Sequence, residues 1–254
     1  MATIKRLLER MGGSLERKLC PGLKNAQYVY KDTLKSHLPK NSVWLDLGCG
    51  HQIFPDWMPS SESDQAVFVQ QCKTVVGIDS DVRSLCNHNV IKYKVVGDIE
   101  RLPFKDNVFQ LITANMVVEH LKNPGDVLAG VYRSLKPEGL FLFHTPNFWN
   151  YIPLINWFIP RSVRIKLIDF LEERKAEDVY PAFYRMNTPR AIREWARRTG
   201  FGLVELKQVN SSPETIRLGP VAVAELLLIR VLSFRWFENF RSNLIVLLQK
   251  KFPA

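Results

Sequence analysis

A short apolar segment that ends in an acid and two glycines constrains this chain more than any other feature. Residues 43–50 read Val-Trp-Leu-Asp-Leu-Gly-Cys-Gly, so Asp46 precedes Gly48 and Gly50. Glycine adopts positive φ without steric cost and has no Cβ, so the backbone turns tightly and a ligand approaches it closely. The segment predicts a strand followed by a turn that binds a nucleotide-like cofactor. A single Gly-x-Gly is weakly specific, so the prediction depends on the rest of the chain.

Four further segments have the composition of buried strands. They are residues 74–79, 93–98, 108–115 and 140–145. The first two are β-branched runs that end in Asp79 and Asp98, and the other two are near-continuous apolar runs, as expected for strands buried on both faces of a parallel sheet. Helix-length segments separate the strands. This alternation predicts an α/β fold with a doubly wound sheet.

Several motifs follow one another in a specific order. They are Leu45-Asp46-Leu47-Gly48-Cys49-Gly50, Gly77-Ile78-Asp79, the run from Gly97-Asp98-Ile99 to Asn107-Val108-Phe109, Glu119-His120-Leu121, and Leu135-Lys136-Pro137-Glu138-Gly139. In this order and spacing, about residues 40–146 resemble the class I S-adenosylmethionine-dependent methyltransferases. More narrowly, they resemble the small-molecule branch of ubiquinone- and menaquinone-type methyltransferases. The resemblance implies S-adenosyl-L-methionine as the cofactor and a Rossmann-like sheet of seven mostly parallel strands.

The resemblance also implies roles for individual residues. The backbone at Gly48 and Gly50 is expected beside the methionyl part of the cofactor, with Asp46 near its ammonium group. Asp79 is expected to hold the ribose hydroxyls, and Asp98 to read the adenine edge. The implied cofactor-binding set is Asp46, Gly48, Cys49, Gly50, Asp79, Ser80, Asp98, Ile99 and Asn115. Each acid has an alternative interpretation as a helix N-cap or a solvated loop carboxylate.

The glycine turn departs from the family pattern. The position of a third glycine is occupied by Ile53, whose bulk would obstruct the close helix–strand packing of a dinucleotide fingerprint. This argues against NAD more strongly than against S-adenosylmethionine. Residues 54–72 also contain extra polar residues, which predict that a surface loop interrupts or precedes the first helix of the sheet.

Catalysis requires little of such a protein, because a sulfonium methyl group is already activated. The protein has to align the acceptor and exclude water. His120, which follows the fourth strand beside Glu119, is the candidate general base, and a structural histidine at a helix start is the alternative. The candidates for the acceptor pocket are Trp149, Tyr184 and Arg185, with His51 and His144 as further possibilities. No metal site is expected.

The chain is expected to form one domain over residues 1–254. Its parts are an N-terminal helical segment (1–40), a cofactor-binding core (41–146), an acceptor-site insertion (147–187) and a C-terminal part of the sheet (188–254). The insertion is interpreted as a lid, with an ordinary capping subdomain as the alternative. A helix is expected to begin at Thr188 and Pro189 and to end at Gly200.

The last third of the chain supplies two strands and an apolar helix. Strands six and seven are expected at residues 201–210 and 243–250, with a largely helical segment over residues 213–241 between them. Burial of this segment is favoured. The alternative is an interfacial helix with Arg230 and Trp236 at lipid headgroups.

The formal net charge of +10 bears on the partners. The basic residues are spread over helices and loops, without the aromatic interleaving of a nucleic-acid module. Nucleic acid is therefore not favoured, and an anionic small substrate or peripheral contact with an anionic membrane explains the charge at least as well. The four cysteines have no metal spacing and no secretory signal is recognised, which predicts a cytoplasmic protein, at most peripheral at the inner face of the membrane.

The sequence therefore predicts methyl transfer from S-adenosylmethionine to a small-molecule or lipid-linked acceptor by in-line displacement. An RNA or protein methyltransferase is the first alternative, and a non-catalytic cofactor-binding scaffold is the second. The acceptor, the methylated atom and the oligomeric state stay open.

Overall fold

The computed structural model describes residues 12–58, 61–151, 181–213, 215 and 220–251. The chain divides into two compact units. The first, here called the helical unit, comprises Met1–Tyr28, Asn147–Pro181 and Gln208–Asn243. The second, the sheet unit, comprises Val29–Pro146, Ala182–Lys207 and Leu244–Ala254. Most of the predicted acceptor-site insertion, residues 147–187, lies outside the described residues.

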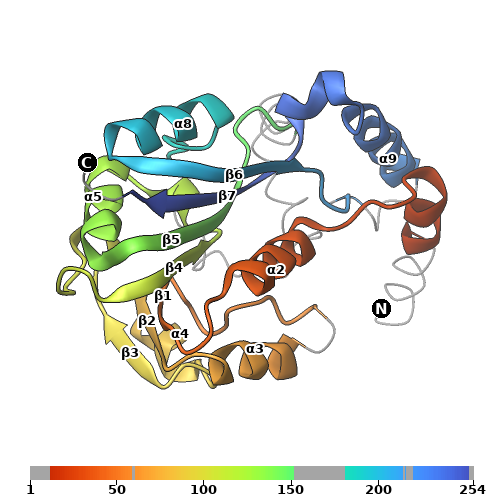
Figure 1. Ribbon diagram of the computed structural model, residues 1–254. Helices are drawn as coiled ribbons and strands as arrows, with labels where there is room; N and C mark the ends of the chain where they lie inside the picture. Colours follow the sequence, from red (N-terminus) through yellow and green to blue (C-terminus); the bar gives the residue numbers. More distant parts are fainter. Residues whose placement is uncertain (1–11, 59–60, 152–180, 214, 216–219, 252–254) are drawn as a thin grey trace. The chain divides into compact units, whose positions relative to one another are not determined.

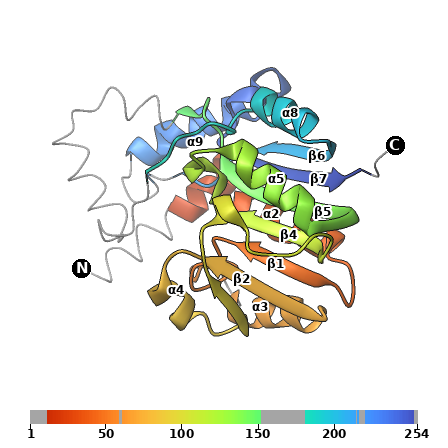
Figure 2. The ribbon, with the colours of Figure 1, turned by 90° about the vertical axis from the view of Figure 1, so that its left-hand side faces the viewer.

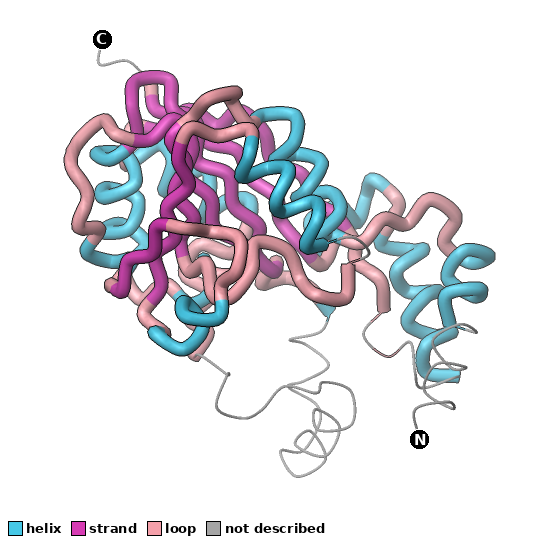
Figure 3. The backbone as a smooth tube through the Cα atoms, turned by 90° about the horizontal axis from the view of Figure 1, so that it is seen from below, coloured by secondary structure: helices cyan, strands magenta, loops and turns pink. Residues whose placement is uncertain are grey.

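The seven predicted strands form one sheet, which confirms the α/β fold (Figures 1 and 3). They are β1 (Val43–Leu47), β2 (Thr74–Asp79), β3 (Tyr93–Val96), β4 (Phe109–Asn115), β5 (Leu135–Pro146), β6 (Phe201–Val209) and β7 (Asn243–Lys250), in the order β3-β2-β1-β4-β5-β7-β6. β1 pairs in parallel with both β2 and β4. β3 pairs in parallel with β2, and β5 pairs in parallel with β4. The strand order therefore reverses at β1.

The last strand runs against its neighbours. Lys250 at the end of β7 donates a hydrogen bond from Nζ to the carbonyl of Leu135, at 2.7 Å, where β5 begins. A Cβ at Gly202, near the start of β6, would lie 2.8 Å from Cε of Lys251, just beyond the end of β7. The end of β7 thus lies beside the beginnings of both β5 and β6, so β6 and β7 form an antiparallel hairpin.

Helices cover both faces of the sheet (Figure 2). They are α2 (Ala26–His37), α3 (Ser61–Gln70), α4 (Val82–Asn87), α5 (Pro124–Ser134) and α8 (Pro189–Arg198), with short 3-10 turns η1 (Ile99–Arg101) and η2 (Val118–His120). α5 and α8 pack together, because their buried residues share one hydrophobic cluster with the sheet. On α2, Tyr30 contacts Phe54 edge to face, and Phe54 contacts Phe68 of α3 in the same way.

Two local predictions agree with the structure and one differs. α8 begins where the sequence predicts, because Thr188 accepts a hydrogen bond from the amide of Ala191 and Pro189 is the first helical residue. A loop precedes α3, as predicted, but the polar residues 61–65 that contributed to this prediction form the first half of the helix. The strand expected at residues 140–145 begins earlier, at Leu135, which pairs with Phe109. A register shift after that pair accommodates the intervening turn-forming residues within one long strand.

The helical unit contains α9 (Pro220–Leu232) and the 3-10 segment η4 (Arg235–Phe240). Leu226 and Ile229 of α9 form a small cluster with Cys20. Among the described residues, no helix combines the length and the apolar character needed to cross a membrane.

Candidate active site

The glycine turn, the second acid and Asn115 emerge at one edge of the sheet. Leu47, the last residue of β1, pairs with Ile78 on one side and Ala114 on the other. The residues that follow these three therefore leave the sheet side by side. In open α/β sheets, ligands bind outside the carboxyl ends of the strands, at the point where the strand order reverses. The strand order of this sheet reverses at β1, so the predicted cofactor residues stand where such a site is expected.

The two glycines of the turn are required for different reasons. Both have positive φ, 59° at Gly48 and 53° at Gly50. A Cβ at Gly48 would lie 2.6 Å from Cγ2 of Val117, whereas a Cβ at Gly50 would meet nothing within 4 Å. Gly48 is thus needed because a larger residue would prevent the turn from packing against Val117. Gly50 leaves open space beside the backbone, which is where a ligand can approach.

The side chain of Cys49 packs the turn against β2. Its side chain is buried, and a Cβ at Gly77 would lie only 2.6 Å from its sulfur, so the small residue on β2 makes room for it. Burial, together with the carboxylates of Asp46 and Asp79, raises the pKa of the Cys49 thiol far above its ordinary value. The thiol is therefore a neutral packing group and not a nucleophile.

Asp79 ties the turn to the end of β2. One carboxylate oxygen accepts a hydrogen bond from the amide of Gly50 at 2.8 Å, and the other accepts from the amide of Asp81 at 2.9 Å. The carboxylate is only half-buried, so part of it stays accessible. A carboxylate in this position fits a ligand with hydroxyl donors, as a ribose diol would provide. Ser80, the next predicted residue, is exposed.

Asp46 is a buried acid without a cationic partner among the described residues. Its side chain is 4% exposed and accepts a hydrogen bond from the hydroxyl of Thr113, which in turn accepts one from the indole of Trp44 at 2.7 Å. Burial raises the pKa of Asp46 to about 7; the Thr113 hydrogen bond opposes this shift and the nearby Asp79 carboxylate adds to it. A ligand ammonium group beside Asp46 would restore the ionised form.

Tyr30 is a site residue that the sequence analysis missed. It is fully buried on α2, and its hydroxyl lies near the Thr113 hydroxyl without a hydrogen bond of normal geometry among the described residues. Burial raises the pKa of Tyr30 well above its ordinary value, and the Asp46 carboxylate contributes to the shift. A buried hydroxyl without a well-formed hydrogen bond and an unpaired buried acid are costly unless a ligand satisfies them. These two groups fit the amino-acid end of S-adenosylmethionine, which carries an ammonium and a carboxylate.

A further pair of residues closes this side of the site. Asn115 at the end of β4 and His144 of β5 are register neighbours, and Oδ1 of Asn115 lies 2.9 Å from Nδ1 of His144. The His144 ring is 2% exposed, and its centroid lies 5.9 Å from that of Tyr30. His144 was only a weak candidate for the acceptor pocket. The structure instead places it inside the wall formed with Asn115 and Tyr30.

Asn115 also holds the backbone at Ile53, where the family pattern has a third glycine. Nδ2 of Asn115 donates to the carbonyl of Ile53 at 3.3 Å, and the amide of Ile53 donates to the side chain of Gln65 on α3 at 2.7 Å. Ile53 itself is buried. Side-chain hydrogen bonds from two elements therefore hold the backbone at the position where related turns rely on close packing of a glycine.

Asp98 caps a short helical turn, which is one of the alternatives that the sequence left open for this acid. It is exposed and caps η1, because its Oδ1 accepts a hydrogen bond from the amide of Glu100 at 2.8 Å. The preceding Gly97 donates its amide to the carbonyl of Asp79 at 3.0 Å, which brings the ends of β2 and β3 together. The half-buried Ile99 packs against the core. The cap orients Asp98 at the edge of the site and leaves its adenine-reading role a prediction.

His120 and Glu119 differ in exposure. The side chain of His120 is one-third exposed, while that of Glu119 is buried, and Nε2 of the histidine lies 3.9 Å from Oε1 of the glutamate. The second carboxylate oxygen of Glu119 accepts a hydrogen bond from Thr145 at 2.9 Å, and the Thr145 hydroxyl accepts one from Asn187 at 2.6 Å. Glu119 thus joins η2, β5 and the segment before α8, and it fixes the backbone that carries His120.

The predicted acceptor residues do not all belong to one unit. Tyr184 and Arg185 are in the sheet unit, where the amides of Phe183 and Tyr184 donate to the carbonyl of Glu119 and Arg185 lies over the Phe183 ring. Tyr184 is therefore held next to η2. Trp149 belongs to the helical unit and is half-exposed. His51 is exposed, with Nε2 3.6 Å from a carboxylate oxygen of Asp56.

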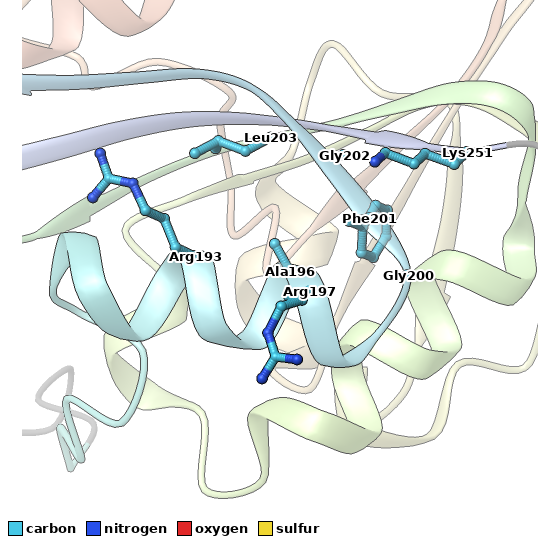
Figure 4. Close-up of a pocket in the computed structure, with 8 residues that line it drawn as sticks. All are labelled: Arg193, Ala196, Arg197, Gly200, Phe201, Gly202, Leu203 and Lys251. Carbon is cyan, nitrogen blue, oxygen red and sulfur yellow. The ribbon is translucent and has the colours of Figure 1, made fainter.

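A hollow of about 470 Å³ lies at the other edge of the sheet (Figure 4). Its cationic lining residues are Arg193 and Arg197 of α8 and Lys251, and its backbone wall is the start of β6. It sits where β6 begins and β7 ends, which is the edge at which the parallel strands start. Its size therefore does not make it the cofactor site.

Comparison with known proteins agrees with this geometry. A family model described as "Methyltransferase domain" matches residues 22–206. Ubiquinone biosynthesis O-methyltransferase from Burkholderia thailandensis is 22% identical over 182 residues, which covers 70% of this chain and 72% of that protein. Demethylmenaquinone methyltransferase from Lactiplantibacillus plantarum is 31% identical over 110 residues, covering 40% and 44% of the two chains.

Solved structures share the fold at low sequence identity. An S-adenosylmethionine-dependent methyltransferase from Mesorhizobium loti superimposes with a TM-score of 0.53 at 17% identity, covering 86% of this chain and 96% of that chain. Geranyl diphosphate C-methyltransferase from Streptomyces coelicolor A3(2), solved with S-adenosyl-L-homocysteine, gives a TM-score of 0.53 at 11% identity, covering 88% and 78%.

Proposed function

We propose that the acceptor of this protein is a small, quinone-like molecule carried on a lipid chain. The chain belongs to the methyltransferase-domain family and is an S-adenosylmethionine-dependent methyltransferase. The observation that carries the cofactor assignment is the group of Asp46, Tyr30 and the open turn at Gly50, at the edge where Asp79 leaves β2. The acceptor class is supported by two relatives whose names refer to ubiquinone biosynthesis and demethylmenaquinone.

The residues around the turn would hold the cofactor, which supplies a methyl group already activated on a sulfonium. Asp46 would pair with its ammonium group and Asp79 with its ribose hydroxyls, while Asp98 and Ile99 would meet the adenine. Asn115 would line the side next to the reactive methyl. These residues bind and orient, and most of the rate acceleration comes from placing the acceptor in line and excluding water.

His120 is proposed as the base that removes a proton from the acceptor. Its partial exposure leaves the ring accessible, and Nε2 lies 3.9 Å from Oε1 of the buried Glu119, which helps to orient the ring. Tyr184, held against the carbonyl of Glu119, would form the neighbouring wall. Arg185 would face an anionic group of the acceptor.

The test is methyl transfer from methyl-labelled S-adenosylmethionine to short-chain hydroquinones and catechols that dissolve without a membrane. We expect labelled product and S-adenosylhomocysteine in equal amounts, and a loss of roughly 10²-fold or more in kcat for His120→Gln with unchanged cofactor affinity. His37→Gln is the matched control, because His37 bonds to a carbonyl of its own helix, that of Thr33. Labelling of RNA or protein instead would replace the proposed acceptor, and cofactor binding without turnover on any acceptor would favour a scaffold.

The proposed location is the cytoplasm. The four cysteines, Cys20, Cys49, Cys72 and Cys86, are all free thiols, which suits a reducing compartment. Measuring the oxidation state of these thiols in freshly lysed cells tests the location independently of activity.

A further inference from the structure

The helix α9 in the helical unit has one satisfied face and one apolar face that is exposed. Its buried residues are Ala222, Glu225, Leu226, Ile229 and Leu232. This inner face packs on Cys20, whose thiol donates to the carbonyl of Leu226 at 3.2 Å. On the outer face, Val221, Leu227 and Val231 are each about half-exposed. Burial, which the sequence favoured, therefore describes the inner face of the helix. An interfacial position, which was the alternative, fits its outer face.

An aromatic segment, residues 234–240, follows the end of α9 along the chain (blue, Figure 1). The side chain of Trp236 is 93% exposed and that of Phe234 is 61% exposed, and Phe237 and Phe240 are also exposed. We call these four residues, with Val221, Leu227 and Val231, the outer apolar surface. Large apolar groups gathered on a surface usually mark a site of interaction. Here they follow one another within 20 residues of the chain.

The charges around this surface favour an anionic partner. Arg230 and Arg235 are exposed, and Glu238 is the exposed acid of the same segment. Glu225 points inward, where it accepts hydrogen bonds from Tyr151 at 2.7 Å and from Thr215. The acid of α9 is thus removed from the outer face, and the basic residues remain.

The aromatic segment is held in shape by a third arginine. The guanidinium of Arg241 donates to the carbonyls of Gln208 and Ser233, at 3.0 and 3.1 Å, and to that of Leu232. These bonds fix the chain on both sides of η4. The exposed aromatic residues are therefore presented on an ordered backbone, so their immobilisation at a partner surface costs little additional entropy.

We propose that the outer apolar surface binds the headgroup region of an anionic lipid membrane. Tryptophan and phenylalanine insert between headgroups and acyl chains, and arginines beside them contact lipid phosphates. The described helices include none that could span a bilayer, so the contact is peripheral. This inference is independent of the proposed methyl transfer, since lipid binding is measurable without cofactor or acceptor. It also provides a route by which a lipid-linked acceptor reaches the enzyme.

The test is co-sedimentation of the full-length protein with vesicles. We use phosphatidylcholine alone and phosphatidylcholine mixed with phosphatidylglycerol, at low and high salt. We expect the protein to pellet with the mixed vesicles at low salt, and the partition coefficient to fall by roughly tenfold at high salt, because salt screens the arginine–phosphate attraction. Absence of binding to mixed vesicles at low salt would overturn the proposal.

Variants locate the contact. Phe234→Ala with Trp236→Ala should lower partition by roughly tenfold or more, and Trp236→Phe should abolish the blue shift of tryptophan emission that vesicles induce. Tyr93→Ala on β3 removes an exposed aromatic ring from the sheet unit and should leave binding unchanged. Because these side chains are exposed, all variants should keep the wild-type melting temperature.

Two other results would assign the surface differently. If the double variant pellets like the wild type, the membrane contact lies elsewhere on the chain and the proposal is wrong. If vesicles are not bound but analytical ultracentrifugation shows a dimer that the double variant loses, the surface joins two copies of this chain.

Discussion

The two edges of the sheet differ: one contains a buried ionisable group, and the other contains an open hollow. At the edge where β1, β2 and β4 end, the buried acid Asp46 lacks a cationic partner among the described residues. At the opposite edge there is a hollow of about 470 Å³, yet Lys250 nearby has its ammonium satisfied by the Leu135 carbonyl and by Asn107.

Empty volume alone therefore does not locate the ligand site, and a buried acid without a counter-ion is the better indicator. A buried ionisable group costs free energy until it is paired, which is why Asp46 points to a ligand. Exposed cations around an open hollow stay hydrated and carry no such cost. The predictions below test this contrast between the two edges.

The largest effect is expected from Gly48→Ala. The new Cβ would lie 2.6 Å from Val117 in a backbone with φ of 59°, so we expect the free energy of unfolding to fall by roughly 2–4 kcal/mol and cofactor binding to be lost. Chemical denaturation and calorimetry measure the two effects. Gly50→Ala is the matched control, because its Cβ meets only open space, and it should cost about 1–2 kcal/mol of stability from φ alone. Equal stability losses for both variants would refute the steric argument.

Asp79→Ala should weaken S-adenosylmethionine and S-adenosylhomocysteine binding. Loss of charge-assisted hydrogen bonds worth roughly 1.5–3 kcal/mol corresponds to about a 10- to 150-fold higher Kd. Asp81→Ala is the control, since Asp81 caps α4 by accepting from the amide of Arg83 and should alter stability by about 1 kcal/mol without altering Kd. An unchanged Kd in a folded Asp79→Ala protein would remove Asp79 from the site.

Asp46 should make cofactor affinity depend on pH near neutrality. The folded protein without cofactor binds the extra proton between pH 3.8 and about 7, and pairing with an ammonium group requires the ionised carboxylate. Affinity should therefore fall as pH drops below 7, by up to roughly tenfold per pH unit. In Asp46→Asn this dependence should disappear, together with the affinity gained at higher pH. Titration calorimetry at several pH values tests it, and a pH-dependent slope retained in the variant would assign the proton to another group.

The same substitution should stabilise the cofactor-free protein. Because burial raises the pKa of Asp46 in the folded state to about 7, the unfolded chain loses this proton at a lower pH than the folded protein does. The free energy of unfolding therefore falls as pH rises from 3.8 to about 7 and stays low above pH 7. Asp46→Asn should thus raise the free energy of unfolding at pH 8 by roughly 1–3 kcal/mol and have little effect near pH 4. Destabilisation at pH 8 would show that the carboxylate has a partner that the described residues do not include.

The smallest effect is expected at the opposite edge. Arg193→Ala with Arg197→Ala removes two of the three cations around the hollow, and both arginine side chains are exposed. Cofactor Kd should change by less than about twofold and stability by less than roughly 0.5 kcal/mol. A loss of affinity comparable to that of Asp79→Ala would mean that the cofactor uses the hollow, and the contrast between the edges would be wrong.

One prediction from the sequence lies beyond the described residues. Trp157→Ala with Phe158→Ala in the insertion is expected to depress methyl transfer and leave cofactor affinity nearly intact, because the strands that carry Gly48, Asp79 and Asp98 are complete before residue 147. Comparing kcat with Kd in a variant that melts cooperatively checks it. A parallel fall in both would make the insertion part of the cofactor site.

Local sequence patterns encode the sheet and the position of its ligand-binding edge. Apolar runs that end in Asp46 and Asp79, followed by a glycine turn, specify buried parallel strands whose carboxyl ends meet, since strand period and glycine stereochemistry are local properties. The same holds for α8, whose start is encoded by Thr188 and Pro189. Local patterns of this kind also carried the resemblance to methyltransferases, which the family match confirms.

Only the tertiary structure decided which side chains lose water and meet across the site. Tyr30, on a helix that precedes the sheet, lies near enough to Asp46 for the carboxylate to raise its pKa. The buried Glu119 is held by Thr145, which Asn187 contacts in turn, and both lie far along the chain. The sequence of α9 is largely apolar, interrupted only by Glu225 and Arg230, so which face is covered depends on its neighbours more than on its own period. Burial, and the pKa shifts and exposed surfaces that follow from it, is a property of many residues packed together, and no local pattern encodes it.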